Sequence, residues 1–281
     1  MDARHPPTHE PAALPMLIAQ VSDLHVCAPG QLANGVVDTN AMARAGLRAV
    51  AALQPRPDAL LLSGDLVETG GAASYAHLLE LLAPIDLPLY PVAGNHDERE
   101  ALAEAFGGRA GPHTARLPGF WQYAASLGPL RLLVLDTVVP RQGHGALCAR
   151  RLDWLDQRLA EDATPTVVAM HHPPFATGIG HMDAMGLLDG AEALEAIVRR
   201  HGHVQAILCG HLHRGIQVRF GGTVASVCPS TAHQIALNLL QSSADGYVME
   251  PPAFQLHLWH GGRLVSHTVP IGDFGGTQPF A

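Results

Sequence analysis

The chain has 281 residues, of which 47% are apolar and 15% charged, so it can bury a sizeable core and is not a disordered, coiled-coil or collagen-like protein. All 17 basic residues are arginine; the absence of lysine excludes P-loop nucleotide-binding proteins, Schiff-base enzymes and protein kinases. The net charge of -8 argues against a nucleic acid polymer as partner, whereas the 18 histidines favour metal or acid–base chemistry.

The chain starts with a segment rich in proline and histidine, and we expect residues 1–14 to form a flexible tail. This segment lacks the basic region of a signal peptide, so we expect a cytoplasmic protein. No apolar run approaches the roughly 18 to 20 residues that span a bilayer, so we expect no membrane partner.

Short apolar runs alternate with helical patterns along most of the chain. The predicted strands are Met16–Val21, Ala59–Leu62, Leu89–Val92, Leu130–Leu135, Thr166–Met170 and Val204–Cys209. The predicted helices are Asn40–Leu53, Ser74–Leu82, Glu98–Phe106, Leu152–Ala160 and Ala191–Arg200. This alternation predicts a layered α/β fold.

The pattern becomes β-rich after Cys209. Two β-hairpins are predicted, at Gly215–Val227 and at Phe254–Val269, the second turning at Gly261-Gly262. We therefore expect a main α/β domain at residues 15–235 and a β-rich extension at residues 236–281. The extension either caps the functional site of the main domain, pairs with another subunit, or packs as an extra sheet on its own core.

Polar clusters follow the predicted strands where each strand ends. They are Asp23-Leu24-His25, Gly64-Asp65, Gly94-Asn95-His96-Asp97, His171-His172 and Gly210-His211-Leu212-His213. Because ligands bind at the carboxyl ends of strands in α/β sheets, we expect these clusters to meet at one edge of the sheet. The glycines allow the chain to bend sharply beside a crowded centre.

The clusters supply oxygen and imidazole donors without a thiolate. In an extended Asp-x-His or His-x-His segment both side chains point to one side, so both reach one ion. The candidate donors are Asp23, His25, Asp65, Asn95, His171, His211 and His213. Such a set suits Mn, Fe, Co or Zn. Seven donors exceed the needs of one open tetrahedral zinc site and predict two divalent metal ions, with Asp65 as the natural shared carboxylate.

The ordered pattern DxH, GD, GNH[DE], H and GHxH resembles the metallophosphoesterase (calcineurin-like) superfamily over most of residues 16–235. The resemblance implies a four-layer α/β/β/α sandwich with a dinuclear centre. It assigns Asp23, His25, Asp65 and His213 to one metal, and Asp65, Asn95, His171 and His211 to the other. The segments LPLYPVAGNHDE, MHHPP and CGHLH are similar to the class III cyclic-nucleotide phosphodiesterase and bacterial glycerophosphodiesterase branch.

Further histidines are candidates for contact with substrate. The segment Pro229–Gln234 is similar to one in those glycerophosphodiesterases that lines the substrate pocket, which suggests His233. We expect His96 to contact the phosphoryl oxygen or protonate the leaving alkoxide, with Asp97 as an orienting carboxylate. His181 follows the MHHPP loop and is a further candidate. His172 competes with His171 as a ligand, and the family pattern favours His171.

Together these features predict a metal-dependent phosphodiesterase in which a metal-bound hydroxide attacks a small diester, either a 3',5'-cyclic nucleotide or a glycerophosphodiester. A phosphomonoesterase or nucleotide pyrophosphatase of the same fold is the alternative enzyme. A metal-binding scaffold on a decayed phosphoesterase fold is the non-enzymatic alternative, although no ligand position is missing. The resemblance also implies a homo-oligomer.

Overall fold

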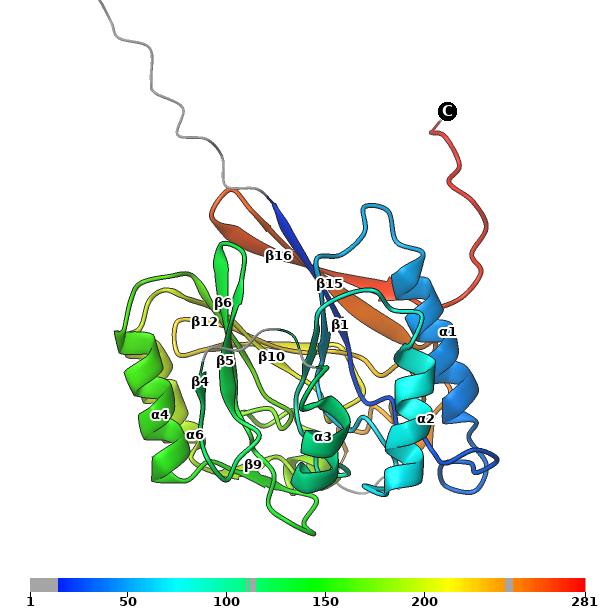
Figure 1. Ribbon diagram of the computed structural model, residues 1–281, viewed down its shortest axis with the longest axis horizontal. Coiled ribbons are helices and arrows are strands. Elements are labelled where there is room, and N and C mark those ends of the chain that lie inside the picture. Colours follow the sequence, from blue (N-terminus) through cyan, green and yellow to red (C-terminus); the bar gives the residue numbers. More distant parts are fainter. Residues whose placement is uncertain (1–14, 110, 112–114, 241–244, 281) are drawn as a thin grey trace, which may run out of the picture.

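The computed structural model describes residues 15–109, 111, 115–240 and 245–280. The predicted tail at residues 1–14 lies outside the described residues. Most strands belong to two sheets that lie between two groups of helices, with α4 and α6 on one side and α1, α2 and α3 on the other (Figure 1). This arrangement confirms the predicted four-layer α/β/β/α sandwich.

The first sheet has five strands in the order β16-β15-β1-β2-β3. Its strands are β1 (Met16–Val21), β2 (Ala59–Leu62), β3 (Leu89–Pro91), β15 (Ala253–His260) and β16 (Arg263–Pro270). The first three are parallel, and β15 is antiparallel to β1. Three helices share its core: α1 (Thr39–Ala51), α2 (Ala72–Leu82) and α3 (Arg99–Phe106).

The second sheet has seven strands in the order β11-β12-β10-β8-β6-β5-β4. Its strands are β4 (Ala115–Arg116), β5 (Tyr123–Leu127), β6 (Leu130–Val134), β8 (Thr166–Ala169), β10 (Val204–Cys209), β11 (Ile216–Phe220) and β12 (Thr223–Val227). Helices α4 (Ala149–Ala160) and α6 (Ala191–Arg200) cover its outer face. Two small strand pairs and one short helix complete the described elements. The pairs are β7 (Gly145–Ala146) with β9 (Leu187–Asp189) and β13 (Gln234–Ile235) with β14 (Tyr247–Val248), and the helix is α5 (Gly180–Asp183).

Alternating residues of β6 show how the layers form. Leu132 and Val134 belong to the core between the two sheets, whereas Leu133 belongs to the core shared with α4 and α6. Both faces of this strand are therefore buried, which explains why its sequence is apolar except for the half-buried Arg131.

The six predicted strands and five predicted helices are confirmed, with end points that differ by three residues or fewer. The expectation of one sheet edge is wrong, because β1, β2 and β3 lie in one sheet and β6, β8 and β10 in the other. Buried parallel strands all read as short apolar runs, so the sequence does not reveal which of them pair. Strand β5 was missed; three of its five residues are Ala or Ser, and they obscure the apolar pattern.

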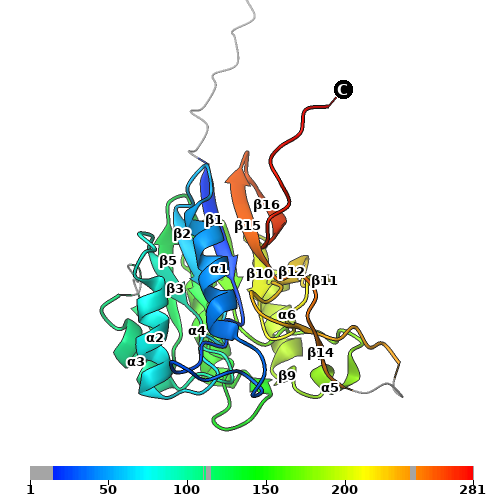
Figure 2. The ribbon, with the colours of Figure 1, turned by 90° about the vertical axis from the view of Figure 1, so that its right-hand side faces the viewer.

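Both predicted hairpins are confirmed. Gly261 and Gly262 form the second turn with φ of 57° and 74°, a conformation that favours glycine. The second hairpin lies beside β1 (Figure 2) and extends the first sheet. The boundary at residue 235 and the capping or oligomerisation role of residues 236–281 stay predictions. None of the helices in the described ranges combines the length and the apolar character needed to cross a bilayer.

Candidate metal centre

The polar clusters lie at the same end of both sheets and bring all seven predicted donors together. Asp65 Oδ2 lies 3.2 Å from His171 Nε2 and 3.7 Å from His25 Nε2. His171 Nε2 also lies 3.2 Å from Asn95 Oδ1. On the other side of Asp65, His25 Nε2 lies 3.1 Å from His213 Nε2. Asp65 thus stands between two groups of donors, as a shared ligand would.

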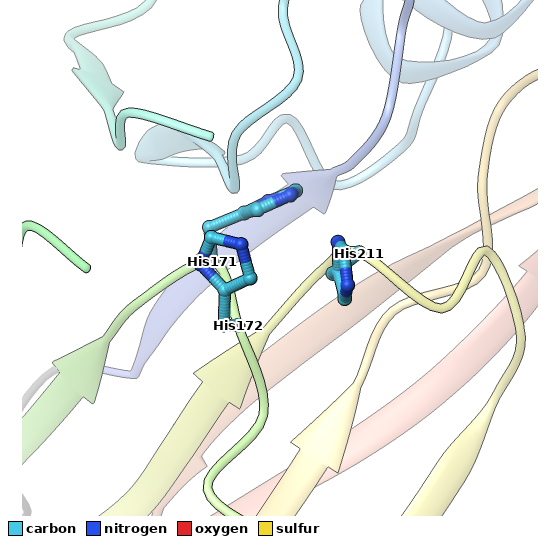
Figure 3. Close-up of side chains that lie close together, drawn as sticks. All are labelled: His171, His172 and His211. Carbon is cyan, nitrogen blue, oxygen red and sulfur yellow. The ribbon is translucent and has the colours of Figure 1, made fainter. Parts of the chain in front are cut away.

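The remaining donors flank these groups. Asp23 Oδ1 lies 3.4 Å from His213 Nε2, and a carboxylate oxygen of Asp23 falls within one metal-sized cluster with Asp65 and His171. His211 lies beside His171, with ring centroids 5.1 Å apart. Figure 3 shows His171 and His211 together at the ends of their strands, with His172 beside them.

The backbone of the Asp-x-His and His-x-His segments corrects the sequence argument. Asp23, His25, His211 and His213 are not extended; their φ values are 52°, 46°, 73° and 53°, in the left-handed region. Asp65 shares this conformation, with φ of 48°. Such non-glycine residues cost roughly 1–3 kcal/mol each and cluster at functional sites. The paired side chains therefore converge through strained turns around a buried leucine, Leu24 or Leu212, and not through strand alternation.

Glycines beside the ligands are required for close approach. A Cβ on Gly64 would collide with the imidazole of His171, and one on Gly94 would collide with Asp65. At Gly210 a Cβ would collide with Ser22 Oγ and lie 2.6 Å from the carbonyl oxygen of Ser63. Any larger residue at these three positions would push the ligands apart.

Three imidazoles are oriented through Nδ1. His171 Nδ1 donates to the Ser63 carbonyl (2.9 Å), and His213 Nδ1 donates to the His233 carbonyl (2.8 Å). His25 Nδ1 lies 2.7 Å from Glu68 Oε2. These contacts leave each Nε2 for the centre, an arrangement typical of metal-binding histidines. Sequence reasoning missed Glu68, although its position three residues after Asp65 could have identified it. The carbonyls of Ser63 and His233 belong to the backbone, so no sequence pattern identifies them.

The donor set suits divalent cations. His211 Nε2 is buried without a hydrogen-bond partner among the described residues, a costly state that a bound ion would relieve. Burial lowers the pKa of His211 and of His213 to about 3, so both imidazoles are neutral, the form that binds metals. Burial would also lower the pKa of His171, but the Asp65 carboxylate outweighs it and raises that pKa to about 9. The buried carboxylates therefore attract positive charge to this point.

His172 differs from its neighbour. Its Nε2 donates to the carbonyl of Gly143 (3.1 Å), and its Nδ1 lies 2.8 Å from the hydroxyl of Thr137. Both ring nitrogens of His172 thus have partners outside the seven donors, and the ring lies close enough to His171 and His211 for the three to form a candidate metal-binding group.

A cleft of about 200 Å³ opens above the donors. His96 and His233, two of the residues predicted to contact substrate, are among those that line it. His96 Nδ1 donates to the Glu68 carbonyl (2.8 Å), which leaves Nε2 for the cleft. His233 stacks against His213, with ring centroids 4.8 Å apart, and its Nδ1 is buried without a hydrogen-bond partner among the described residues.

Asp97 and His181 stand apart from this cleft. Asp97 accepts hydrogen bonds from Tyr75 Oη (2.8 Å) and from the backbone N–H groups of Gly94 and Leu66, so it joins the loops that carry Asn95 and Asp65. Burial, and then the Asp65 charge, raise the pKa of Asp97 to about 6. His181 is not among the lining residues; its Nδ1 lies 3.0 Å from Asp245 Oδ1.

Sequence reasoning also missed the apolar wall of the cleft. Met182 and Met185, in and just after α5, line it together with Ile235. Only the tertiary fold carries these residues to the site, so no local pattern identifies them.

Two stacked sheets whose strand ends present seven oxygen and nitrogen donors define a dinuclear metal-binding fold. Comparison with known proteins is consistent with this class. The model of the calcineurin-like phosphoesterase family matches residues 16–215, and the chain belongs to this family.

Curated relatives match nearly the whole chain. A probable glycerophosphodiester phosphodiesterase of Arcobacter nitrofigilis is 32% identical over 94% of this chain and 97% of its own. A probable cyclic nucleotide phosphodiesterase of Synechococcus is 38% identical over 85% of this chain and 89% of its own. Among solved structures, a purple acid phosphatase from yellow lupin seeds shares the fold, with a TM-score of 0.67 at 13% identity over 92% of this chain and 52% of its own.

Proposed function

We propose that the protein is a phosphodiesterase that uses two divalent metal ions to hydrolyse small phosphodiesters, either 3',5'-cyclic nucleotides or glycerophosphodiesters. The observation that carries this proposal is the convergence of seven donors around the single carboxylate of Asp65. The printed names of the two curated relatives, a glycerophosphodiester phosphodiesterase and a cyclic nucleotide phosphodiesterase, support the substrate class.

The donors divide into two ligand groups. One ion would be held by Asp23, His25, Asp65 and His213, and the other by Asp65, Asn95, His171 and His211. Bound divalent ions would lower the pKa of a water and neutralise charge that develops on the phosphoryl oxygens. The oxygen and nitrogen donors suit Mn, Fe, Zn or Co.

The chain's own residues orient the substrate and move protons. His96 Nε2 faces the cleft and would contact a phosphoryl oxygen or protonate the leaving alkoxide, because its Nδ1 is held by the Glu68 carbonyl. His233 would contact the substrate from the other side of the cleft. Asp97 would act indirectly, by fixing the loops of Asp65 and Asn95. His181 would act at the rim, where it meets Asp245.

The proposal is tested by reconstituting metal-free protein with Mn²⁺, Fe²⁺, Zn²⁺ or Co²⁺ and measuring hydrolysis of bis(p-nitrophenyl) phosphate and p-nitrophenyl phosphate. We expect faster turnover of the diester. A preference for the monoester would favour a phosphomonoesterase, and reconstituted protein without activity on any ester would favour a binding scaffold. Cyclic AMP, cyclic GMP and glycerophosphoethanolamine then separate the two diester classes.

Two further properties belong to the same proposal. The family resemblance supports a homo-oligomer, which sedimentation of the purified protein tests. A cytoplasmic location is the second property, and fractionation of cells that express the chain tests it.

A further inference from the structure

A buried polar side chain lies between the two sheets, below the metal centre. Gln20 on β1 is fully buried. Its amide Nε2 donates to Ser63 Oγ (2.8 Å) and to the carbonyl of Cys209 (3.1 Å). Its Oε1 accepts from His257 Nε2 (2.9 Å). One amide thus joins β1 to the end of β2, to β10 in the opposite sheet, and to β15.

The partners of Gln20 stand just before the ligands. Gln20 itself precedes Asp23 by three residues, Ser63 directly precedes Gly64-Asp65, and Cys209 directly precedes Gly210-His211. Ser63 also provides the carbonyl that orients His171. The side chain of Gln20 therefore connects the strand ends that precede three of the five clusters, and one of its partners, Ser63, contacts the ring of His171 in a fourth.

The hydrogen-bond pattern allows one arrangement of these groups. The Cys209 carbonyl can only accept, so the amide nitrogen of Gln20 faces it and the amide oxygen faces His257. His257 Nε2 then carries the proton, and Nδ1 accepts from Ser266 Oγ (2.7 Å) on β16. Burial lowers the pKa of His257 to about 3, so the ring is neutral. The C-terminal hairpin thereby holds the amide in one orientation.

Stability does not explain these polar residues. A buried hydrogen bond contributes only about 1 kcal/mol net, and replacing both partners with apolar groups of similar shape is close to neutral. Apolar residues of the same strands, Ile18, Leu60 and Leu208, belong to one hydrophobic core. Hydrogen bonds are directional, so they fix the spacing between strand ends more closely than apolar packing does.

We propose that Gln20, held by His257, is a positioning residue that sets the spacing between the β1, β2 and β10 ends and so the separation of the two metal sites. The inference rests on the ligand assignment of the proposed function.

The test compares Gln20→Leu/His257→Leu with Gln255→Leu. The paired substitution removes Gln20 and His257 together, while Ser63 Oγ keeps the Val21 carbonyl (3.3 Å) and the Cys209 carbonyl keeps the Cys228 N–H (2.9 Å), so the variant should fold. Gln255 is the matched control: it is buried on β15 opposite Gln20, but its side chain contacts Ser226 and the Val227 carbonyl on β12, which precede no proposed ligand. Mn²⁺ binding to the metal-free proteins is measured by calorimetry, and the coupling between two bound Mn²⁺ ions by electron paramagnetic resonance.

We expect the paired variant to bind Mn²⁺ at one or both sites about 10- to 100-fold more weakly, with altered coupling, as when partners of metal ligands are removed. Gln255→Leu should match the wild type in both measurements. A folded paired variant with wild-type affinity and coupling would overturn the inference, and so would equal losses in the control.

If the paired variant does not fold, Ser63→Ala provides the test. It removes one contact of Gln20 but keeps the backbone carbonyl of residue 63, which contacts His171. A several-fold loss of Mn²⁺ affinity supports positioning, and unchanged affinity overturns it. Wild-type protein that fails to bind two Mn²⁺ ions would refute the proposed function itself, which is a separate outcome.

Discussion

Two turns, one from each sheet, present paired donors in the same local conformation but are held differently. In both, two left-handed residues flank a buried leucine. The turn at Asp23–His25 is held by backbone hydrogen bonds, from Asp23 N to Gly64 O (3.1 Å) and from His25 N to Asp65 O (3.0 Å). The turn at His211–His213 also has backbone hydrogen bonds, from Leu212 N to Gly210 O (2.9 Å) and from Ser230 N to His213 O (3.2 Å), but its first residue is held by a side chain, because His211 N donates to the carboxylate of Asp23 (3.0 and 3.1 Å).

This difference makes the two turns unequal. The first turn is supported by its neighbour within the sheet, whereas the second is attached to a ligand of the first. Asp23 is thus both a proposed ligand and the anchor of the opposite sheet's loop. A substitution in the first turn should therefore also disturb the second turn, whereas a substitution in the second turn should leave the first unchanged.

The largest effect is expected for Asp65→Ala, since Asp65 contacts ligands of both groups. Loss of the shared carboxylate should reduce bound Mn²⁺ below two per chain and lower kcat/KM by about 10³-fold or more, which corresponds to about 4 kcal/mol. Metal analysis and diester hydrolysis measure this. Two tightly bound ions in the variant would contradict the assignment of Asp65 as the bridge.

His96→Ala should affect the rate without affecting either turn. The backbone N–H that donates to Asp65 Oδ1 (2.9 Å) remains, so metal content should survive. Removing a general acid should lower kcat by about 10²- to 10⁴-fold. Steady-state kinetics with parallel metal analysis test this, and loss of both ions would show that His96 is structural.

Asp23→Ala and His211→Ala test the inequality of the turns directly. Asp23→Ala should weaken both ions, by at least about 100-fold at the more affected site, while His211→Ala should weaken one ion and leave the other unchanged. Calorimetric titration of the metal-free variants with Mn²⁺ resolves the two sites. If each variant lost Mn²⁺ affinity at one site only, the two turns would be independent of each other.

Glu68→Gln should have a smaller effect on the first turn, because it weakens the contact that orients His25. Metal affinity is expected to fall about 10- to 100-fold. Glu195→Gln, at an ion pair with Arg199 on α6, is the matched control and should leave affinity unchanged. Wild-type affinity in Glu68→Gln would mean that His25 is held by other contacts.

His181→Gln should have the smallest effect. Its partner Asp245 is 66% exposed, and exposed ion pairs contribute about 0–1 kcal/mol. We expect a change in KM of about threefold or less and full metal content. A large fall in kcat would place His181 at the reacting atoms instead of the rim.

Much of the fold was predictable because buried strands and amphipathic helices carry strong local patterns. The run Met16–Val21 and the helix Ala191–Arg200 have the predicted ends. Strand pairing was not predictable, since β2 and β8 are both fully buried runs of four residues but lie in different sheets.

The candidate ligands could be named from the sequence because each lies a short distance after a strand. How their side chains come together could not be predicted, because the pattern Asp-x-His is the same in a left-handed turn and in an extended segment. The contacts that orient the ligands were largely hidden as well. Ser63 and His233 act through backbone carbonyls, which any residue possesses.

The pairing of β1 with β15 carries a consequence for biosynthesis. Residues 16–20 find their antiparallel partner only in residues 255–259. During translation β1 emerges before β15, and one of its edges stays unpaired until β15 has left the ribosome. A truncated product that ends before residue 253 would expose this edge to other chains and lack the support of His257 beneath Gln20.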